Sequence, residues 1–257
     1  MNARSRVLII ASLVLISTVF TACGRGDKGS VPLNSGVIAP ILLFNGTGAS
    51  PGDVEAVETI LNNNHLSYST ANSSELNRMT ESQIRQYRLL IVPGGNFVDI
   101  GNSLTAGTTA NVRNAIQNGT NYLGICAGGF LAGKFGNGYN SFNLTGGVQF
   151  GFYSAEAHGI RKTAVPITID SAPTLEHYWE DGPQFTGWGA VVGRYPDNTP
   201  AIVEGKCGSG WVILVGVHPE APANWRRGLT FNTPASEDNA YAATMIQAAL
   251  EGKSLRM

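Results

Sequence analysis

The segment Tyr122-Leu123-Gly124-Ile125-Cys126-Ala127-Gly128-Gly129 decides the fold class of this 257-residue chain. Its apolar first half predicts a short buried strand that ends directly at a cysteine. Small residues then open a helix, as a tight strand-to-helix turn requires. Backbone N–H groups at a helix start favour a thiolate and can stabilise an oxyanion. The segment therefore predicts a nucleophilic Cys126; a buried structural cysteine in a tight turn is the alternative.

Two further motifs also end predicted strands. An apolar run at residues 89–92 stops at Pro93-Gly94-Gly95, whose backbone N–H groups are expected to face the same site. A later strand runs into His218, and Glu220 follows two residues on. In an extended segment such residues point the same way, so Glu220 is expected to orient His218 while His218 takes the thiol proton. Open α/β sheets have their sites at such strand ends.

The rest of the chain alternates predicted strands and helices. Strands are expected at residues 37–44, 66–70, 89–92 and 122–125, and helices at 51–61, 80–87 and 110–119. After about Gly146, strands are expected at 163–170, 188–195, 201–204 and 211–217, before a final helix at 236–250. This order predicts an α/β fold with a mostly parallel central sheet and extra antiparallel strands in the C-terminal half.

Composition excludes several classes of protein. A hydrophobic fraction of 43% and a net charge of -1 argue against disorder, and no Lys/Arg run indicates a nucleic-acid partner. The chain has no glycine-rich phosphate loop, and no residues cluster with metal-ligand spacing, so we predict no cofactor and no metal. Three cysteines do not make a disulfide scaffold. Cys207 is expected to be free; pairing with Cys126, which would stop thiol catalysis, is the alternative.

The first residues are interpreted as a targeting signal. Arg4 and Arg6 precede an apolar run at 7–20, which is shorter than the roughly 20 residues of a spanning helix. Phe20-Thr21-Ala22-Cys23 resembles a bacterial lipobox, so Cys23 is expected to be lipidated after cleavage. A soluble secreted protein and an uncleaved anchor are the alternatives.

These features predict three segments. Residues 1–22 are a signal peptide, residues 23–36 are a Gly/Pro/polar tether, and residues 37–257 are a single domain. The protein is then expected to be exported to the cell envelope and held by its lipid on the periplasmic side of a membrane.

The order of the three strand-end motifs resembles the class I glutamine amidotransferase-like fold, a flavodoxin-like three-layer sandwich. More closely, residues 37–251 resemble the N-terminal domain of eukaryotic-type biotin–protein ligases and the free-standing bacterial proteins related to it. Besides the segments around Cys126 and His218, the likeness rests on Phe44–Ser50 and Tyr178–Pro183.

The resemblance implies roles for individual residues. Cys126 would be the nucleophile, His218 the general base and acid, and Glu220 its orienting carboxylate. The backbone N–H groups of Ala127 and of Gly95, or its neighbour Gly94, would bind the oxyanion. The reaction would be attack on a carboxamide or related carbonyl, followed by hydrolysis of a thioester.

The same resemblance sets limits on the activity. No biotin-ligase catalytic domain is expected after the final helix, and an exported protein would have no ATP-using synthetase to receive ammonia. Hydrolysis of a small amide, peptide or ester is therefore expected, with a peptidase-like activity as one variant. The alternative is a non-catalytic ligand-binding or assembly module at the cell envelope. A protein partner is left open.

Overall fold

Short apolar strands that run parallel form the centre of the sheet. The computed structural model describes residues 38–136, 138–169 and 173–256. Five parallel neighbours lie in the order β2 (Tyr68–Ala71), β1 (Ile41–Phe44), β3 (Leu89–Val92), β4 (Asn121–Ile125) and β11 (Gly210–Val215). Every residue of β1 and β3 is buried, as expected for parallel strands that are covered on both faces.

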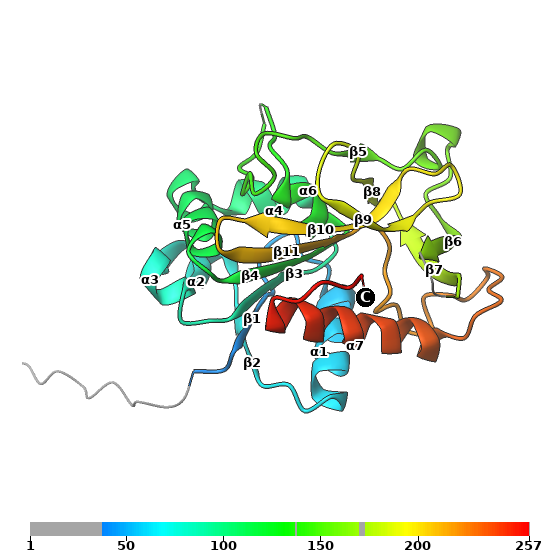
Figure 1. Cartoon of the computed structure of the whole chain (residues 1–257), viewed down its shortest axis with the longest axis horizontal. Coiled ribbons are helices and arrows are strands. Elements are labelled where there is room, and N and C mark those ends of the chain that lie inside the picture. Colours follow the sequence, from blue (N-terminus) through cyan, green and yellow to red (C-terminus); the bar gives the residue numbers. More distant parts are fainter. Residues whose placement is uncertain (1–37, 137, 170–172, 257) are drawn as a thin grey trace, which may run out of the picture. The chain divides into compact units, whose positions relative to one another are not determined.

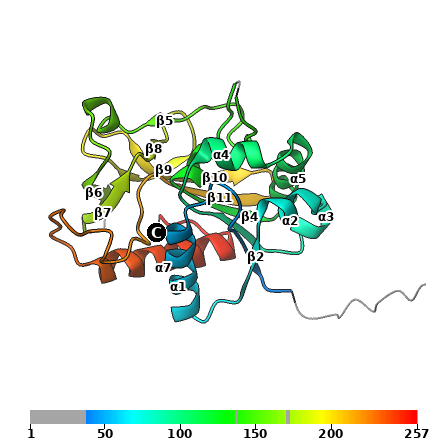
Figure 2. The same ribbon diagram turned by 180° about the vertical axis from the view of Figure 1, so that it is seen from behind.

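Helices cover the two faces of this sheet, so the domain has three layers (Figure 1, and from behind Figure 2). On one face lie α1 (Pro51–Asn63) and α7 (Ala235–Glu251), whose apolar side chains meet those of the strands. The other face is covered by α2 (Ser73–Arg78), α3 (Glu81–Ile84), α4 (Phe97–Ser103), α5 (Ala106–Gln117) and α6 (Ala127–Ala132). The sheet thus separates two hydrophobic cores.

The sheet continues with antiparallel strands. Beyond β11 the order is β10 (Pro200–Cys207), β9 (Ala190–Arg194), β6 (Lys162–Ile169) and β7 (Leu175–Glu180). A separate small pair is formed by β5 (Gly151–Phe152) and β8 (Pro183–Gln184), with the short 3-10 helix η1 (Glu156–His158) after β5. The last strands bring β7 beside the end of β11, where His218 bridges to Tyr178.

The α/β architecture predicted from the sequence is confirmed, although some element bounds differ. The predicted final helix is α7, one residue longer at each end. The predicted helix at 80–87 is only α3, and the sequence patterns do not reveal α2, α4 or β7. These segments are short, and β7 mixes charged with aromatic residues, so none of them has a clear apolar period.

The predicted signal peptide, lipobox and tether lie outside the described residues, and so do residue 37 and the end of the predicted strand at 163–170. Within the part of the chain that the structure describes, none of the helices combines the length and apolar character needed to span a bilayer. The proposed division into three segments stays a prediction.

Candidate active site

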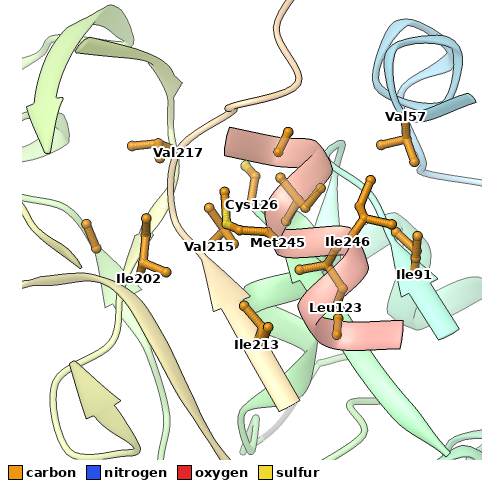
Figure 3. Close-up of a cluster of buried hydrophobic side chains, with 14 of the residues drawn as sticks. Val57, Ile91, Leu123, Cys126, Ile202, Ile213, Val215, Val217, Met245 and Ile246 are labelled. Carbon is orange, nitrogen blue, oxygen red and sulfur yellow. The ribbon is translucent and has the colours of Figure 1, made fainter. Parts of the chain in front are cut away.

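Cys126 occupies a strained turn between β4 and α6. Its φ of 48° and ψ of -102° lie in a region that side chains rarely adopt. Its N–H donates to the carbonyl oxygen of Val215 at 2.8 Å, which ties the turn to β11. A side chain at Gly128 would lie 2.1 Å from the carbonyl oxygen of Val92, so the turn requires glycine there. Figure 3 shows Cys126 at the border of the core between Val215 and α7.

The first N–H groups of α6 follow Cys126. Ala127 is the first residue of this helix, and the leading N–H groups of a helix have no acceptor inside it. They lie next to the thiol, where charge would develop on a carbonyl oxygen under attack. In its protonated form the thiol donates to the carbonyl oxygen of Glu180 at 3.6 Å.

His218 and Glu220 meet behind this turn, as their spacing predicts. The Oε1 atom of Glu220 lies 2.9 Å from Nδ1 of His218, and both residues are buried. The His218 N–H donates to the carbonyl oxygen of Tyr178 at 2.8 Å, which fixes the backbone beside β7. A carboxylate at Nδ1 selects the tautomer and leaves Nε2 for proton transfer.

Asp53 is a member of this site that the sequence patterns did not single out. Its Oδ1 atom lies 3.1 Å from Nδ1 of His218, and the residue is 6% exposed. It stands in the first turn of α1, where Ser50 caps the helix by accepting the Asp53 N–H at 3.4 Å. An acidic residue in the first turn of a helix is common because it interacts favourably with the helix dipole. The position of Asp53 in the sequence therefore gives no sign of a second role.

The charges in the site influence one another. Burial by itself would lower the pKa of His218, but the negative charges of Cys126, Glu220 and Asp53 raise it well above its usual value of 6.5. Burial favours a higher pKa for Asp53, yet His218 and the Ser50 cap hold it below 3.8. Burial raises the pKa of Glu220 despite its contact with His218. The charges around the ring therefore favour an imidazolium at His218.

Cys126 and His218 line one cavity of about 430 Å³, together with Asp53. One wall is aromatic, and another carries charged side chains. The aromatic residues are Phe97, Phe130 and Phe152, and the charged ones are Arg161, Glu180 and Asp181. Asp181 pairs with Arg161. The size suits a small organic ligand with both apolar and polar parts.

The two glycines predicted for the oxyanion site lie in different places. Gly95 lines the cavity, and its φ of 141° is one that glycine adopts most easily. Gly94 packs behind it, where a Cβ atom would lie 2.0 Å from Asp53 Oδ1 and 2.7 Å from His218 Cε1. Gly94 therefore leaves room for the Asp53–His218 contact.

The described residues include one group that could hold a metal ion by its geometry. It consists of Asp53, His218 and Glu220, whose possible ligand atoms all lie within 4.8 Å of one another. Both carboxylates are directed at the same ring atom, Nδ1. A metal ion would have to replace the hydrogen on that nitrogen. We therefore interpret the group as an N–H between two carboxylates.

The remaining sequence candidates lie elsewhere. Cys126 and Cys207 are both free thiols, so the structure contains no disulfide between them. Beyond the predicted residues, Glu156 of η1 pairs at 3.2 Å with Arg161, which lines the charged side of the cavity. Cys23 lies outside the described residues.

Comparisons with known proteins agree with this fold. The family model described as "Biotin-protein ligase, N terminal" matches residues 39–164. The biotin–protein ligase of Schizosaccharomyces pombe is 28% identical over a region that covers 52% of this chain and 26% of that protein. This chain therefore spans about a quarter of the length of that relative.

Solved structures resemble the domain at low identity. A glutamine amidotransferase superposes with a TM-score of 0.54 at 19% identity, over 70% of this chain and 90% of that one. PurLQS from Thermotoga maritima gives 0.55 at 14% identity, over 82% and 99%. At such identities the likeness shows the fold, which is of the glutamine amidotransferase type.

Proposed function

We propose that this chain, whose residues 39–164 match the family model described as "Biotin-protein ligase, N terminal", is a member of that family and acts as a cysteine-dependent hydrolase of a small amide, peptide or ester. One observation carries the proposal. Cys126 lies in a strained strand-to-helix turn at a cavity that it shares with His218, and buried carboxylates face the far side of the imidazole. A thiol poised beside an oriented base is the arrangement of a covalent catalyst.

The reaction follows from these positions. His218 takes the proton of Cys126, and the thiolate forms a bond to the carbonyl carbon of the substrate. The carbonyl oxygen gains negative charge beside the N–H groups of Ala127 and Gly95. The bond to the leaving amine or alcohol then breaks, and His218 returns the proton to that group. A thioester on Cys126 remains.

Hydrolysis closes the cycle. His218 removes a proton from a water molecule, the resulting hydroxide attacks the thioester, and the carbon–sulfur bond breaks. The thiolate is released with a carboxylic acid as the product, and no other reactant is needed. Glu220 keeps the ring aligned through both steps because it holds Nδ1.

A cellular address is proposed with this activity. We infer from the apolar leader and the Phe20–Cys23 motif that the protein is exported and held at the cell envelope by a lipid on Cys23. Membrane fractionation of cells producing the full chain tests this. Wild-type protein is expected in the membrane fraction, and the Cys23→Ser variant is expected to lose this membrane association. Cys207→Ser is the matched control, and equal membrane association of all three would contradict the inference.

Intact-protein mass spectrometry with 4-nitrophenyl acetate tests the chemistry. Wild-type protein is expected to gain one acetyl group quickly and to lose it as the thioester hydrolyses. Cys126→Ala should gain none at this site, whereas Cys207→Ala should behave as wild type. His218→Ala should acylate slowly and retain the acetyl group.

The other outcomes also decide the question. If wild-type protein takes up no acetyl group, or takes it up equally in Cys126→Ala, the proposed hydrolase is wrong. The binding or assembly module then becomes the better hypothesis, in which the fold holds a ligand at the cavity without turning it over.

A further inference from the structure

Two buried carboxylates face one nitrogen of His218. Nδ1 lies 2.9 Å from Glu220 Oε1 and 3.1 Å from Asp53 Oδ1. An imidazole carries a single hydrogen on this atom, and its hydrogen bond goes to Glu220. Among the described residues no group donates a hydrogen bond to Asp53 Oδ1, although the atom is buried. Charge attraction to the ring is therefore the interaction that holds this oxygen in place.

The backbone around Asp53 is arranged to admit this contact. Ser50 caps α1, and its own N–H donates to the carbonyl oxygen of Gly94 at 3.0 Å, which anchors the helix start to the end of β3. The missing side chain of Gly94 leaves the space that Asp53 and His218 fill. The first turn of α1 therefore brings Asp53 to a place where any residue larger than glycine at position 94 would collide with its carboxylate.

The charges require a cation between these carboxylates. Removing a carboxylate from water is unfavourable unless an opposite charge faces it. In the part of the chain that the structure describes, the ion pairs of Asp53 and Glu220 are both with His218, and neither includes a lysine or arginine. His218 is therefore the one cationic partner that these two carboxylates have among the described residues.

We propose that Asp53 is a second positioning residue of the active site, which flanks Nδ1 opposite Glu220 and holds His218 as an imidazolium next to Cys126. The titratable groups that face this ring are Asp53 from α1, Cys126 before α6, Tyr178 on β7, and Glu220. A catalytic use of the His218 imidazolium rests on the proposed function, whereas the contact between Asp53 and His218 is independent of it.

An NMR titration of the His218 ring proton tests the proposal in the full chain. Cys126→Ala serves as the background, so that the thiol does not titrate with the ring, and His218→Gln assigns the signal. Adding Asp53→Asn should lower the pKa of His218 by about 1–3 units, the usual effect of losing a nearby opposite charge.

Asp99→Asn is the matched control. Asp99 holds the corresponding first-turn position of α4, behind the Asn96 cap, and its side chain is exposed. A titration of Asp53→Asn that superimposes on that of Asp99→Asn would overturn the proposal. If Asp53→Asn does not fold, Asp53→Ser keeps a hydrogen-bonding side chain at the helix start and removes the same charge.

The two proposals fail separately. A protein that shows no acetylation of Cys126 but a lowered His218 pKa in Asp53→Asn would lack the hydrolase activity and keep the positioning contact. The reverse result would leave the hydrolase in place and remove Asp53 from its machinery.

Discussion

Two histidines are buried beside carboxylates in this domain, and the negative charges of those carboxylates are balanced in different ways. His177 on β7 lies with Nδ1 3.4 Å from Asp238 Oδ2, and Asp238 also contacts the guanidinium of Arg226. That guanidinium donates to the carbonyl oxygens of Glu176 and Thr233 as well. His218 faces two carboxylates instead, those of Asp53 and Glu220. Among the described residues, neither of these carboxylates forms an ion pair with an arginine or lysine.

The difference separates a structural cluster around His177 from the cluster of Asp53, Cys126, His218 and Glu220 that we propose to be catalytic. Around His177 the arginine supplies the positive charge, and the cluster joins the first turn of α7 to β7 away from the cavity. Around His218 the imidazole must itself supply that charge, and it borders the cavity with Cys126. A protonated histidine that can pass its proton on is useful only in the second setting.

Removing the arginine should give the largest loss of stability. Arg226→Met leaves Asp238, which is 0% exposed, without its cation and also removes the stacking of Arg226 on Phe231 at 3.9 Å. Breaking a buried pair in this way costs about 3–5 kcal/mol of unfolding free energy. Urea denaturation followed by fluorescence measures the loss.

A double variant that also changes Asp238, the carboxylate of the same ion pair, provides the control. Arg226→Met with Asp238→Asn removes both charges and should recover part of the stability. Cys126 alkylation by iodoacetamide should keep its rate in the folded variants. A loss of alkylation that follows the loss of stability would mean that the two clusters are not independent.

Gly94→Ala should disturb the proposed catalytic cluster around His218. The new Cβ atom would lie 2.0 Å from Asp53 Oδ1 and 2.7 Å from His218 Cε1, so one of these groups must move. Overpacking typically costs about 1–3 kcal/mol, and here it should also slow alkylation of Cys126 near neutral pH. Gly107→Ala in α5 is the matched control, because its nearest neighbour is 3.7 Å away. Normal alkylation in Gly94→Ala would show that the Asp53–His218 contact is dispensable.

The sequence predicted the parts of the site that depend on local patterns. An apolar run that stops at Cys126, and another that stops at His218 with Glu220 after it, are visible because neighbouring residues carry the signal. The parallel order of β3, β4 and β11 then brings these strand ends together. Periodicity and strand ends were therefore sufficient for the fold class and for bringing Cys126, His218 and Glu220 to the same end of the sheet.

The residues that the sequence did not reveal depend on contacts between distant segments. Asp53 has an ordinary place in a helix start, and only the packing of α1 against the end of β3 gives it a second role. Gly94 was predicted as an oxyanion donor, whereas its packing shows that it also makes room for Asp53. The ion cluster of His177 joins three separate segments and has no local pattern at all.

The pH dependence of stability should report the raised pKa of His218. The raised pKa of His218 contributes stability that is fully present below about pH 6.5 and is lost as the pH rises through the folded-state pKa. The excess stability of wild type over His218→Gln should therefore shrink above this pH, by about 1.4 kcal/mol for each unit by which the pKa is raised. Urea denaturation between neutral and alkaline pH measures it.

The Arg226 cluster offers the contrast. Guanidinium groups stay protonated wherever proteins fold, so the deficit of Arg226→Met should not follow the same curve. An advantage over His218→Gln that grows toward alkaline pH would contradict the assignment of a stabilised imidazolium.

The smallest effect is expected from the outer support of Glu220. Asn239 on α7 donates from Nδ2 to the carbonyl oxygens of Pro219, at 2.9 Å, and Ala221, at 3.4 Å, so it holds the backbone on both sides of Glu220. Asn239→Ala should cost about 1 kcal/mol and slow alkylation of Cys126 slightly, because Glu220 keeps its own contact with His218. Thr244→Ala, which loses one hydrogen bond to Ala240 on the exposed side of the same helix, is the control. If both variants lose equal stability and neither slows alkylation, α7 supports only the fold, and the orientation of Glu220 depends on His218 and Asp53 alone.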